Sequence, residues 1–270
     1  MTGEGAEASL AAWTDELDAL ARTPRLLVAL DFDGTLAPLV DDPMSARMTP
    51  EAAAAVAELL AAPDTTVAFV SGRTLADLQV ISEHRDDSVV TLAGSHGAQW
   101  WEPGGAADAE AGEHEAAEVA LRDELRAAAE EIASAVPGAW VEPKTFGFGV
   151  HSRLVEGADA GRVHERIDAL MAARAPHWRR REGHSITEYA FRSDGKDTAV
   201  ARLRATTGAT AVLFAGDDRT DEDALRSLDA GDVGIRVGPG ETAASVRVGG
   251  IAELAALLTR LAHQRVSARQ

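Results

Sequence analysis

Residues 26–36 read LLVALDFDGTL, a run of five apolar residues followed at once by Asp31, Phe32, Asp33 and a Gly-Thr pair. Continuous rather than alternating apolarity in a run this short is typical of a strand covered on both faces, as in a parallel sheet. Parallel sheets bind their ligands at the carboxyl ends of the strands. The stretch therefore predicts a buried parallel strand that ends in a functional site.

Four more apolar runs share this form, and each ends in polar or glycine-rich residues. They are residues 67–70 before Ser71, 89–93 before Gly94, 211–215 before Gly216 and 233–237 before Gly238. Helical patterns lie between the runs, at about 50–62, 73–81, 197–206, 221–229 and 251–265. Alternating strands and helices predict an α/β fold with a doubly wound, Rossmann-like parallel sheet.

The middle of the chain departs from this alternation. Residues 113–135 have a helical pattern, 140–144 and 148–153 are strand candidates, 158–174 are helical, and 178–181 and 185–191 are again strand candidates. The order of two strands after each helix predicts an inserted α+β cap domain at residues 103–190. Residues 1–102 and 191–270 are then the catalytic core.

The composition of the 270-residue chain excludes several classes of function. With 44 acidic and 26 basic residues the formal charge is −18, which disfavours a nucleic-acid or anionic-membrane surface. The absence of cysteine excludes a disulfide, a thiolate nucleophile and cysteine-ligated zinc. Residues 1–22 are acidic and helical in pattern, unlike a signal peptide, and no run reaches transmembrane length. We expect a cytoplasmic protein with a small-molecule ligand, present as a monomer or weak dimer.

Asp31 and Asp33 are the first candidates for chemistry. Two carboxylates separated by one residue, at the end of a buried strand and before a Gly-Thr turn, can serve as a nucleophile and a proton donor. The alternative is that an aspartate at a strand end only caps a turn. That alternative leaves the second aspartate unexplained.

A dense acidic loop follows the run at 211–215. Residues 216–223 read GDDRTDED, with five acids in seven residues. Such density at a strand end needs a cation, and ligation by oxygen alone selects a hard ion, which we predict to be Mg²⁺. Asp217 is the preferred ligand, with Asp218 and Asp221 around it; a solvated acidic loop is the alternative.

Three cationic or polar positions suit a phosphate group. Ser71 and Gly72 precede a predicted helix, whose first N–H groups can bind phosphate oxygens, and Arg73 adds positive charge. Lys196 is one of only two lysines in the chain, the other being Lys144. Taken alone, Ser-Gly-Arg is a common turn and Lys196 could lie on the surface.

Together these motifs resemble those of the haloacid dehalogenase-like phosphotransferases, in the order that this superfamily requires. Within it, DFDGTLAPLV (31–40), GSHGA (94–98), VEPK (141–144), GDDRTDEDA (216–224) and VGPGETA (237–243) are similar to the trehalose-6-phosphate phosphatases. The resemblance covers about residues 25–250. It implies hydrolysis of trehalose 6-phosphate through an aspartyl-phosphate, with a cap that closes over the sugar.

The resemblance also implies roles for individual residues. The implied catalytic residues are Asp31, Asp33, Ser71 and Lys196; the substrate-binding residues are Thr35, Gly72, Arg73, His96, Gly97, Glu142, Lys144 and Glu188; the Mg²⁺ ligands are Asp31, Asp33, Asp217, Asp218 and Asp221.

The cap departs from the family pattern at four positions. Gly147 stands where a serine is expected, Ser152 where a tyrosine is expected, and Ala190 with Phe191 where Arg-Pro is expected. Polar contacts of this kind decide sugar identity, so another sugar or pseudo-disaccharide phosphate is an alternative substrate. A sugar-phosphate sensor without catalysis is a further alternative, which the intact nucleophile and acid disfavour.

Overall fold

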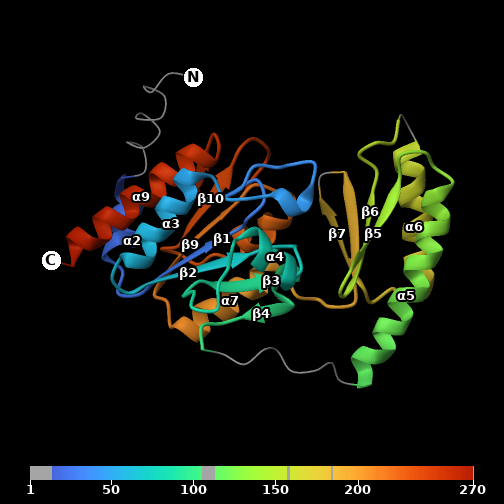
Figure 1. The fold of residues 1–270 in the computed structure, drawn as a ribbon, viewed down its shortest axis with the longest axis horizontal. Helices are drawn as coiled ribbons and strands as arrows, with labels where there is room; N and C mark the ends of the chain where they lie inside the picture. Colours follow the sequence, from blue (N-terminus) through green and yellow to red (C-terminus); the bar gives the residue numbers. More distant parts are fainter. Residues whose placement is uncertain (1–13, 105–112, 157–158, 184, 270) are drawn as a thin grey trace. The chain divides into compact units, whose positions relative to one another are not determined.

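The computed structural model describes residues 14–104, 113–156, 159–183 and 185–269. The chain forms two compact units. Residues 1–107 and 194–270 make up the first, called the core unit below, and residues 108–193 make up the second, called the inserted unit. Figure 1 traces both units along the chain.

The core unit contains a seven-stranded sheet with the order β11-β10-β9-β1-β2-β3-β4. The strands are β1 (Leu26–Leu30), β2 (Thr65–Val70), β3 (Thr91–Gly94), β4 (Gln99–Trp101), β9 (Ala211–Gly216), β10 (Val233–Val237) and β11 (Val246–Val248). All neighbours are parallel except β3 and β4. The five strands predicted from the sequence are confirmed, and β1 lies between β9 and β2. The short edge strands β4 and β11 were not predicted.

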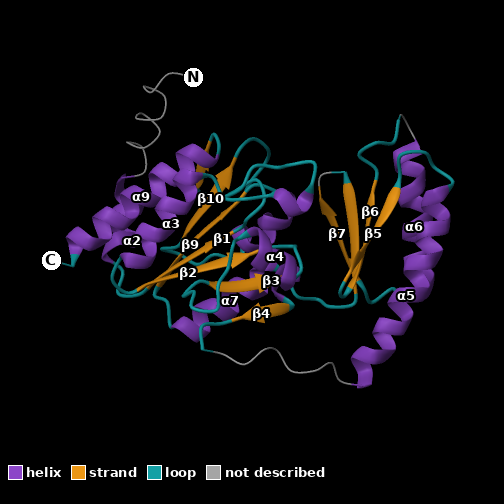
Figure 2. Ribbon diagram, in the orientation of Figure 1, coloured by secondary structure: helices purple, strands orange, loops and turns teal. Residues whose placement is uncertain are grey.

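Helices cover both faces of this sheet, as Figure 2 shows. One face packs against α2 (Thr14–Arg22), α3 (Pro50–Ala61), α4 (Leu75–Ile81) and α9 (Ile251–Ala268), and the other against α7 (Lys196–Thr207) and α8 (Glu222–Arg226). Successive side chains of β1 pack on opposite faces of the sheet: Val28 belongs to the hydrophobic core on the first face and Ala29 to the core on the second. The predicted doubly wound α/β core is therefore confirmed.

Several element boundaries differ from the prediction for local reasons. Helix α4 begins at Leu75 rather than 73, because the Thr74 side chain caps it by accepting from the N–H of Asp77. The helix predicted at 221–229 is a 3₁₀ turn, η3 (Arg219–Asp221), followed by the short α8. Two more 3₁₀ turns are η1 (Pro43–Ser45) and η2 (Ser95–Gly97). Of the helix expected within residues 1–22, residues 1–13 lie outside the described part of the chain.

The inserted unit has a four-stranded antiparallel sheet with the order β5-β6-β8-β7. Its elements are α5 (Glu113–Ser134), β5 (Trp140–Lys144), β6 (Gly147–His151), α6 (Asp159–Arg174), β7 (Arg179–Gly183) and β8 (Ile186–Ala190). Both helices pack on one face of the sheet, around Phe148, Val150 and Tyr189. The opposite face of this sheet carries polar side chains.

Within the described ranges, no helix is both long enough and apolar enough to cross a lipid bilayer.

Arg265, on the buried side of α9, connects that helix to the end of α2 and to the segment before β2. Its side chain is fully buried and donates to carbonyl oxygens at the end of α2 and before β2. The acceptors are Leu20 at 3.2 Å, Ala21 at 3.3 Å, Thr23 at 2.9 Å, Pro63 at 2.9 Å and Asp64 at 2.7 Å. The carbonyls at a helix end need such donors when they are buried.

Replacing Arg265 with Met should therefore lower the free energy of unfolding by about 3 kcal/mol, because several buried carbonyls lose their donor. The expected fall in melting temperature is roughly 6–12 °C. Arg226→Met, at a side chain that is 63 % exposed, is the control and should change little. Equal melting temperatures for the two variants would contradict this role.

Candidate active site

Lys196 is the centre of the candidate site. Its Nζ lies 2.5 Å from Asp31 Oδ1 and 2.6 Å from Asp221 Oδ1, and all three side chains are buried. Asp31 directly follows β1, Lys196 is the first residue of α7, and Asp221 ends η3. The site thus joins three segments that are far apart in the sequence.

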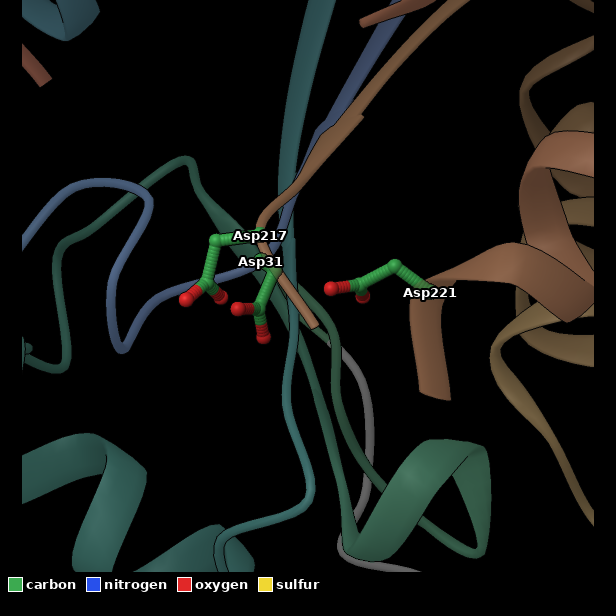
Figure 3. Close-up of side chains that lie close together, drawn as sticks. All are labelled: Asp31, Asp217 and Asp221. Carbon is green, nitrogen blue, oxygen red and sulfur yellow. The ribbon is translucent and has the colours of Figure 1, made fainter. Parts of the chain in front are cut away.

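Asp217 completes a group of three carboxylates with Asp31 and Asp221. Each of the three offers an oxygen within 4.8 Å of the others, and Figure 3 shows their carboxyl groups pointing toward one another. Two glycines make room for them. A side chain at Gly34, where φ is +77°, would overlap the Asp217 carboxylate, and one at Gly216 would overlap Asp221.

The three carboxylates repel one another, so a bound cation would stabilise their charged forms. Burial, together with the charges of Asp221 and Asp217, raises the pKa of Asp31 well above its usual value, although Lys196 opposes this. Burial and Asp221 raise the pKa of Asp217 to about 7. Burial disfavours the charged form of Lys196, but the charges of Asp221 and Asp31 outweigh it and raise its pKa. Three carboxylates therefore share a single ammonium group.

The donor set fits a hard divalent cation, because it consists of carboxylate oxygens alone. Asp217 and Asp31 are the better placed ligands. The oxygens of Asp221 are the more firmly engaged: Oδ1 accepts from Lys196 at 2.6 Å and Oδ2 from the N–H of Asp218 at 2.9 Å, whereas Oδ2 of Asp31 has only the longer contact with Thr35, at 3.4 Å. Asp221 therefore orients Lys196 and the acidic loop.

Two of the sequence-predicted metal ligands lie outside this three-carboxylate group. Both oxygens of Asp33 accept from Arg73, at 2.9 Å from Nε and 2.7 Å from Nη2. Asp218 contributes its backbone, with an N–H that donates to Asp221 and a carbonyl that accepts from Arg236 at 2.8 Å. Arg73, predicted to bind a phosphate, pairs with Asp33 in this structure.

The remaining predicted residues of the core unit surround the ends of β1, β2 and β3. Thr35 donates to Asp31 Oδ2 at 3.4 Å, and the buried Ser71 accepts from the N–H of Arg73 at 3.1 Å. The His96 ring lies against Gly72, where a methyl group would come within 2.7 Å of it.

The backbone around His96 is strained. Ser95, His96 and Gly97 have φ values of 49°, 58° and 101°, a left-handed run that is costly for the two residues other than glycine. The N–H of His96 donates to the carbonyl of Ser71 at 2.8 Å, which joins this turn to the end of β2.

The predicted residues of the inserted unit form a second polar cluster, on the face of its sheet opposite the helices. Lys144 Nζ lies 2.8 Å from Glu188 and 3.4 Å from Glu142. Glu142 also bonds to His151 Nε2 at 2.7 Å, and the His151 ring stacks on Trp140 with centroids 4.4 Å apart. Burial disfavours the charge on Lys144, but Glu188 and Glu142 outweigh this and raise its pKa.

Sequence reasoning missed two residues around these clusters. Arg236 is buried in β10, where it donates to the Asp218 carbonyl and lies 3.6 Å from Glu222. A charge inside the otherwise apolar run 233–237 was the available signal. The bond of His151 to Glu142 depends on the pairing of β5 with β6, which the sequence does not show.

The sheet order, the two-layered core and the strand-end carboxylates define a haloacid dehalogenase-like fold. A haloacid dehalogenase-like hydrolase from B. subtilis shares this fold, with a TM-score of 0.57 and 16 % identity over 86 % of this chain and 97 % of that chain. The family model for trehalose-phosphatase matches residues 29–248. The chain therefore belongs to the trehalose-phosphatase family.

Individual relatives agree with this assignment. The chain is 33 % identical over 242 residues to probable trehalose-phosphate phosphatase 9 of Oryza sativa subsp. japonica, covering 80 % of this chain and 63 % of that protein. The chain thus spans somewhat less than two thirds of that relative's length. The structure resembles the C-terminal domain of C. albicans trehalose-6-phosphate phosphatase, with a TM-score of 0.77 and 20 % identity over 92 % and 95 % of the two chains.

The raised pKa of Asp217 predicts how the metal-free protein depends on pH. A carboxyl whose pKa is about 7 in the folded state, against 3.8 ordinarily, makes the protein lose stability as the pH rises from about 4 to about 7. Asp217→Asn removes that charge. In EDTA at pH 8 this variant should melt higher than the wild type, by about 2–4 °C for each kcal/mol of repulsion relieved.

Thermal unfolding at pH 6 and pH 8, with EDTA or with Mg²⁺, measures this difference. Mg²⁺ should stabilise the wild type more at pH 8 than at pH 6, since its ligands must be deprotonated. The matched control is Asp223→Asn, at a nearby carboxylate that is 41 % exposed. Lower stability of Asp217→Asn than of the wild type in EDTA at pH 8 would refute the electrostatic account.

Proposed function

We propose that the protein is a Mg²⁺-dependent phosphatase that hydrolyses trehalose 6-phosphate to trehalose and phosphate. One observation carries the proposal: the buried carboxylate of Asp31 lies at the end of β1, bonded to Lys196 and beside Asp217. This arrangement supplies a nucleophile, a fixed positive charge and a cation site in one place. The family membership of the chain supports the choice of substrate.

Asp31 is the proposed nucleophile. One carboxylate oxygen attacks phosphorus, the bond to the sugar oxygen breaks, and an aspartyl-phosphate forms. Lys196 stays protonated, as its raised pKa favours, and attracts the phosphoryl oxygens. Ser71 and the N–H groups around it bind the same oxygens. A Mg²⁺ ion held by Asp31 and Asp217 would supply charge neutralisation to the phosphoryl group.

Asp33 is the proposed acid and base. It donates a proton to the departing sugar oxygen and later accepts one from the water that hydrolyses the intermediate. Both of its oxygens accept from Arg73 in this structure. The guanidinium group of Arg73 must therefore release Asp33 before Asp33 can donate a proton. In this proposal Arg73 turns to the phosphate group and so frees Asp33.

The inserted unit is proposed to select the sugar, as a cap domain does. The carboxylates of Glu142 and Glu188 accept hydrogen bonds from the sugar hydroxyl groups, and the Lys144 ammonium donates hydrogen bonds to the same hydroxyl groups. One observation favours a different sugar phosphate as a second candidate substrate. A side chain at Gly147 would overlap the carbonyl of Tyr189, so the serine expected there cannot be accommodated in this backbone.

A panel of phosphate esters separates the two substrates. Phosphate release would be measured for trehalose 6-phosphate, glucose 6-phosphate, sucrose 6-phosphate and p-nitrophenyl phosphate, each with Mg²⁺ and with EDTA. The proposal expects the highest kcat/KM for trehalose 6-phosphate and loss of turnover in EDTA. A preference for another ester would establish the second candidate. Binding of a sugar phosphate without turnover would reject both.

Asp31→Asn should abolish turnover, with kcat at least about 10³-fold below the wild type, because an amide cannot form the acyl phosphate. Folding should persist, because Lys196 keeps its buried ion pair with Asp221 at 2.6 Å. Phosphate release and circular dichroism measure the two properties. Asp87→Asn, at a side chain that is 78 % exposed, serves as the control. Retained phosphate release from Asp31→Asn would reject the mechanism.

A further inference from the structure

The polar face of the inserted unit's sheet is arranged in rows that cross all four strands. The strand register places Glu142 of β5, Gly149 of β6, Glu188 of β8 and Arg181 of β7 in a single row. Directly paired residues project from the same face of a sheet.

The side chains of Arg181's neighbours establish its direction. Arg180 donates to Asp168 of α6 at 2.7 Å, and Asp168 also accepts from Tyr189 at 2.6 Å, on the helix-covered side of the sheet. Successive side chains of a strand point to opposite faces. Arg181 therefore projects from the polar face, where it is partly exposed, opposite Glu188.

Gly149 opens the middle of this row. A methyl group built there would lie 3.3 Å from Cε of Lys144 and 2.9 Å from Cδ1 of Ile186. The Lys144 stem thus passes over Gly149, and its ammonium reaches Glu188 two strands away at 2.8 Å. At its centre the row therefore carries the Lys144 stem in place of a side chain of its own, and Glu142 and Arg181 stand at its two ends.

We infer that Arg181 is a specificity-determining residue, which binds hydroxyl groups of the sugar portion of the substrate together with Glu188. This inference rests on the proposed function. The row, together with the Lys144 ammonium that reaches across it from the neighbouring row, offers two carboxylates that accept hydrogen bonds and two cations that donate them. Sugar hydroxyl groups both donate and accept, so a surface with both kinds of group satisfies them.

The guanidinium group suits this role better than an ammonium group would. Its fork donates two parallel hydrogen bonds in one plane, so it can bridge neighbouring hydroxyl groups. Lys144 supplies an ammonium group between Glu142 and Glu188.

Three variants test this role: Arg181→Met, Arg181→Lys and, as a matched control, Arg162→Met at an α6 side chain that is 72 % exposed. The measured quantity is the ratio of kcat/KM for trehalose 6-phosphate to kcat/KM for p-nitrophenyl phosphate, which has no sugar. Arg181→Met should lower this ratio about ten- to hundredfold, mainly through KM for the sugar phosphate. Arg181→Lys should recover part of the loss, and Arg162→Met should leave the ratio as in the wild type.

Binding is measured separately by titrating trehalose 6-phosphate into the Asp31→Asn protein, with and without Arg181→Met. The second change should weaken binding by a similar factor. If the wild type prefers the sugar phosphate but Arg181→Met leaves the ratio and the binding unchanged, this inference alone fails. Equal losses on both substrates would also overturn it, because they indicate a general defect. If the wild type hydrolyses p-nitrophenyl phosphate but no sugar phosphate, the proposed function fails as well.

Discussion

The buried ammonium of Lys196 is the contact on which the rest of the candidate site depends. It bonds to Asp31 at 2.5 Å and to Asp221 at 2.6 Å, and so fixes the start of α7 against the ends of β1 and η3. Removing one partner of a buried ion pair leaves the other charge without compensation, which is strongly destabilising. In the proposed reaction, the same charge that holds these segments together also attracts the phosphoryl oxygens. The contacts between these segments and the proposed reaction therefore both require a positive charge at position 196.

Small residues constrain the site as firmly as the charged ones. Gly34 and Gly216 leave the space that the Asp217 and Asp221 carboxylates occupy, and Gly149 leaves the path of the Lys144 stem. In each case an added methyl group would meet a functional side chain or its stem. The positions of these acidic side chains thus depend partly on the absence of a side chain at the glycines.

The sequence predicted the parts of the fold that depend on strong local patterns. Apolar runs located the five inner strands, and the residues after them identified Asp31, Ser71 and Asp217, because the carboxyl ends of parallel strands meet at one edge. It did not predict the short strands β4 and β11, whose pairing depends on tertiary contacts. Nor could it predict which charged groups would pair. The Asp33–Arg73 contact joins residues 40 positions apart, and only the folded chain brings them together.

The scarcity of lysine has a consequence for covalent labelling. The chain contains two ε-amines, of which Lys196 is 3 % exposed and Lys144 is 25 % exposed and bonded to Glu188. Raised pKa values keep both protonated, and a protonated amine does not react with acylating reagents. Amine-directed dyes, cross-linkers and coupling resins would therefore react only slowly with these two side chains in the folded protein. Any acylation of Lys144 would report directly that the polar face of the inserted unit had opened.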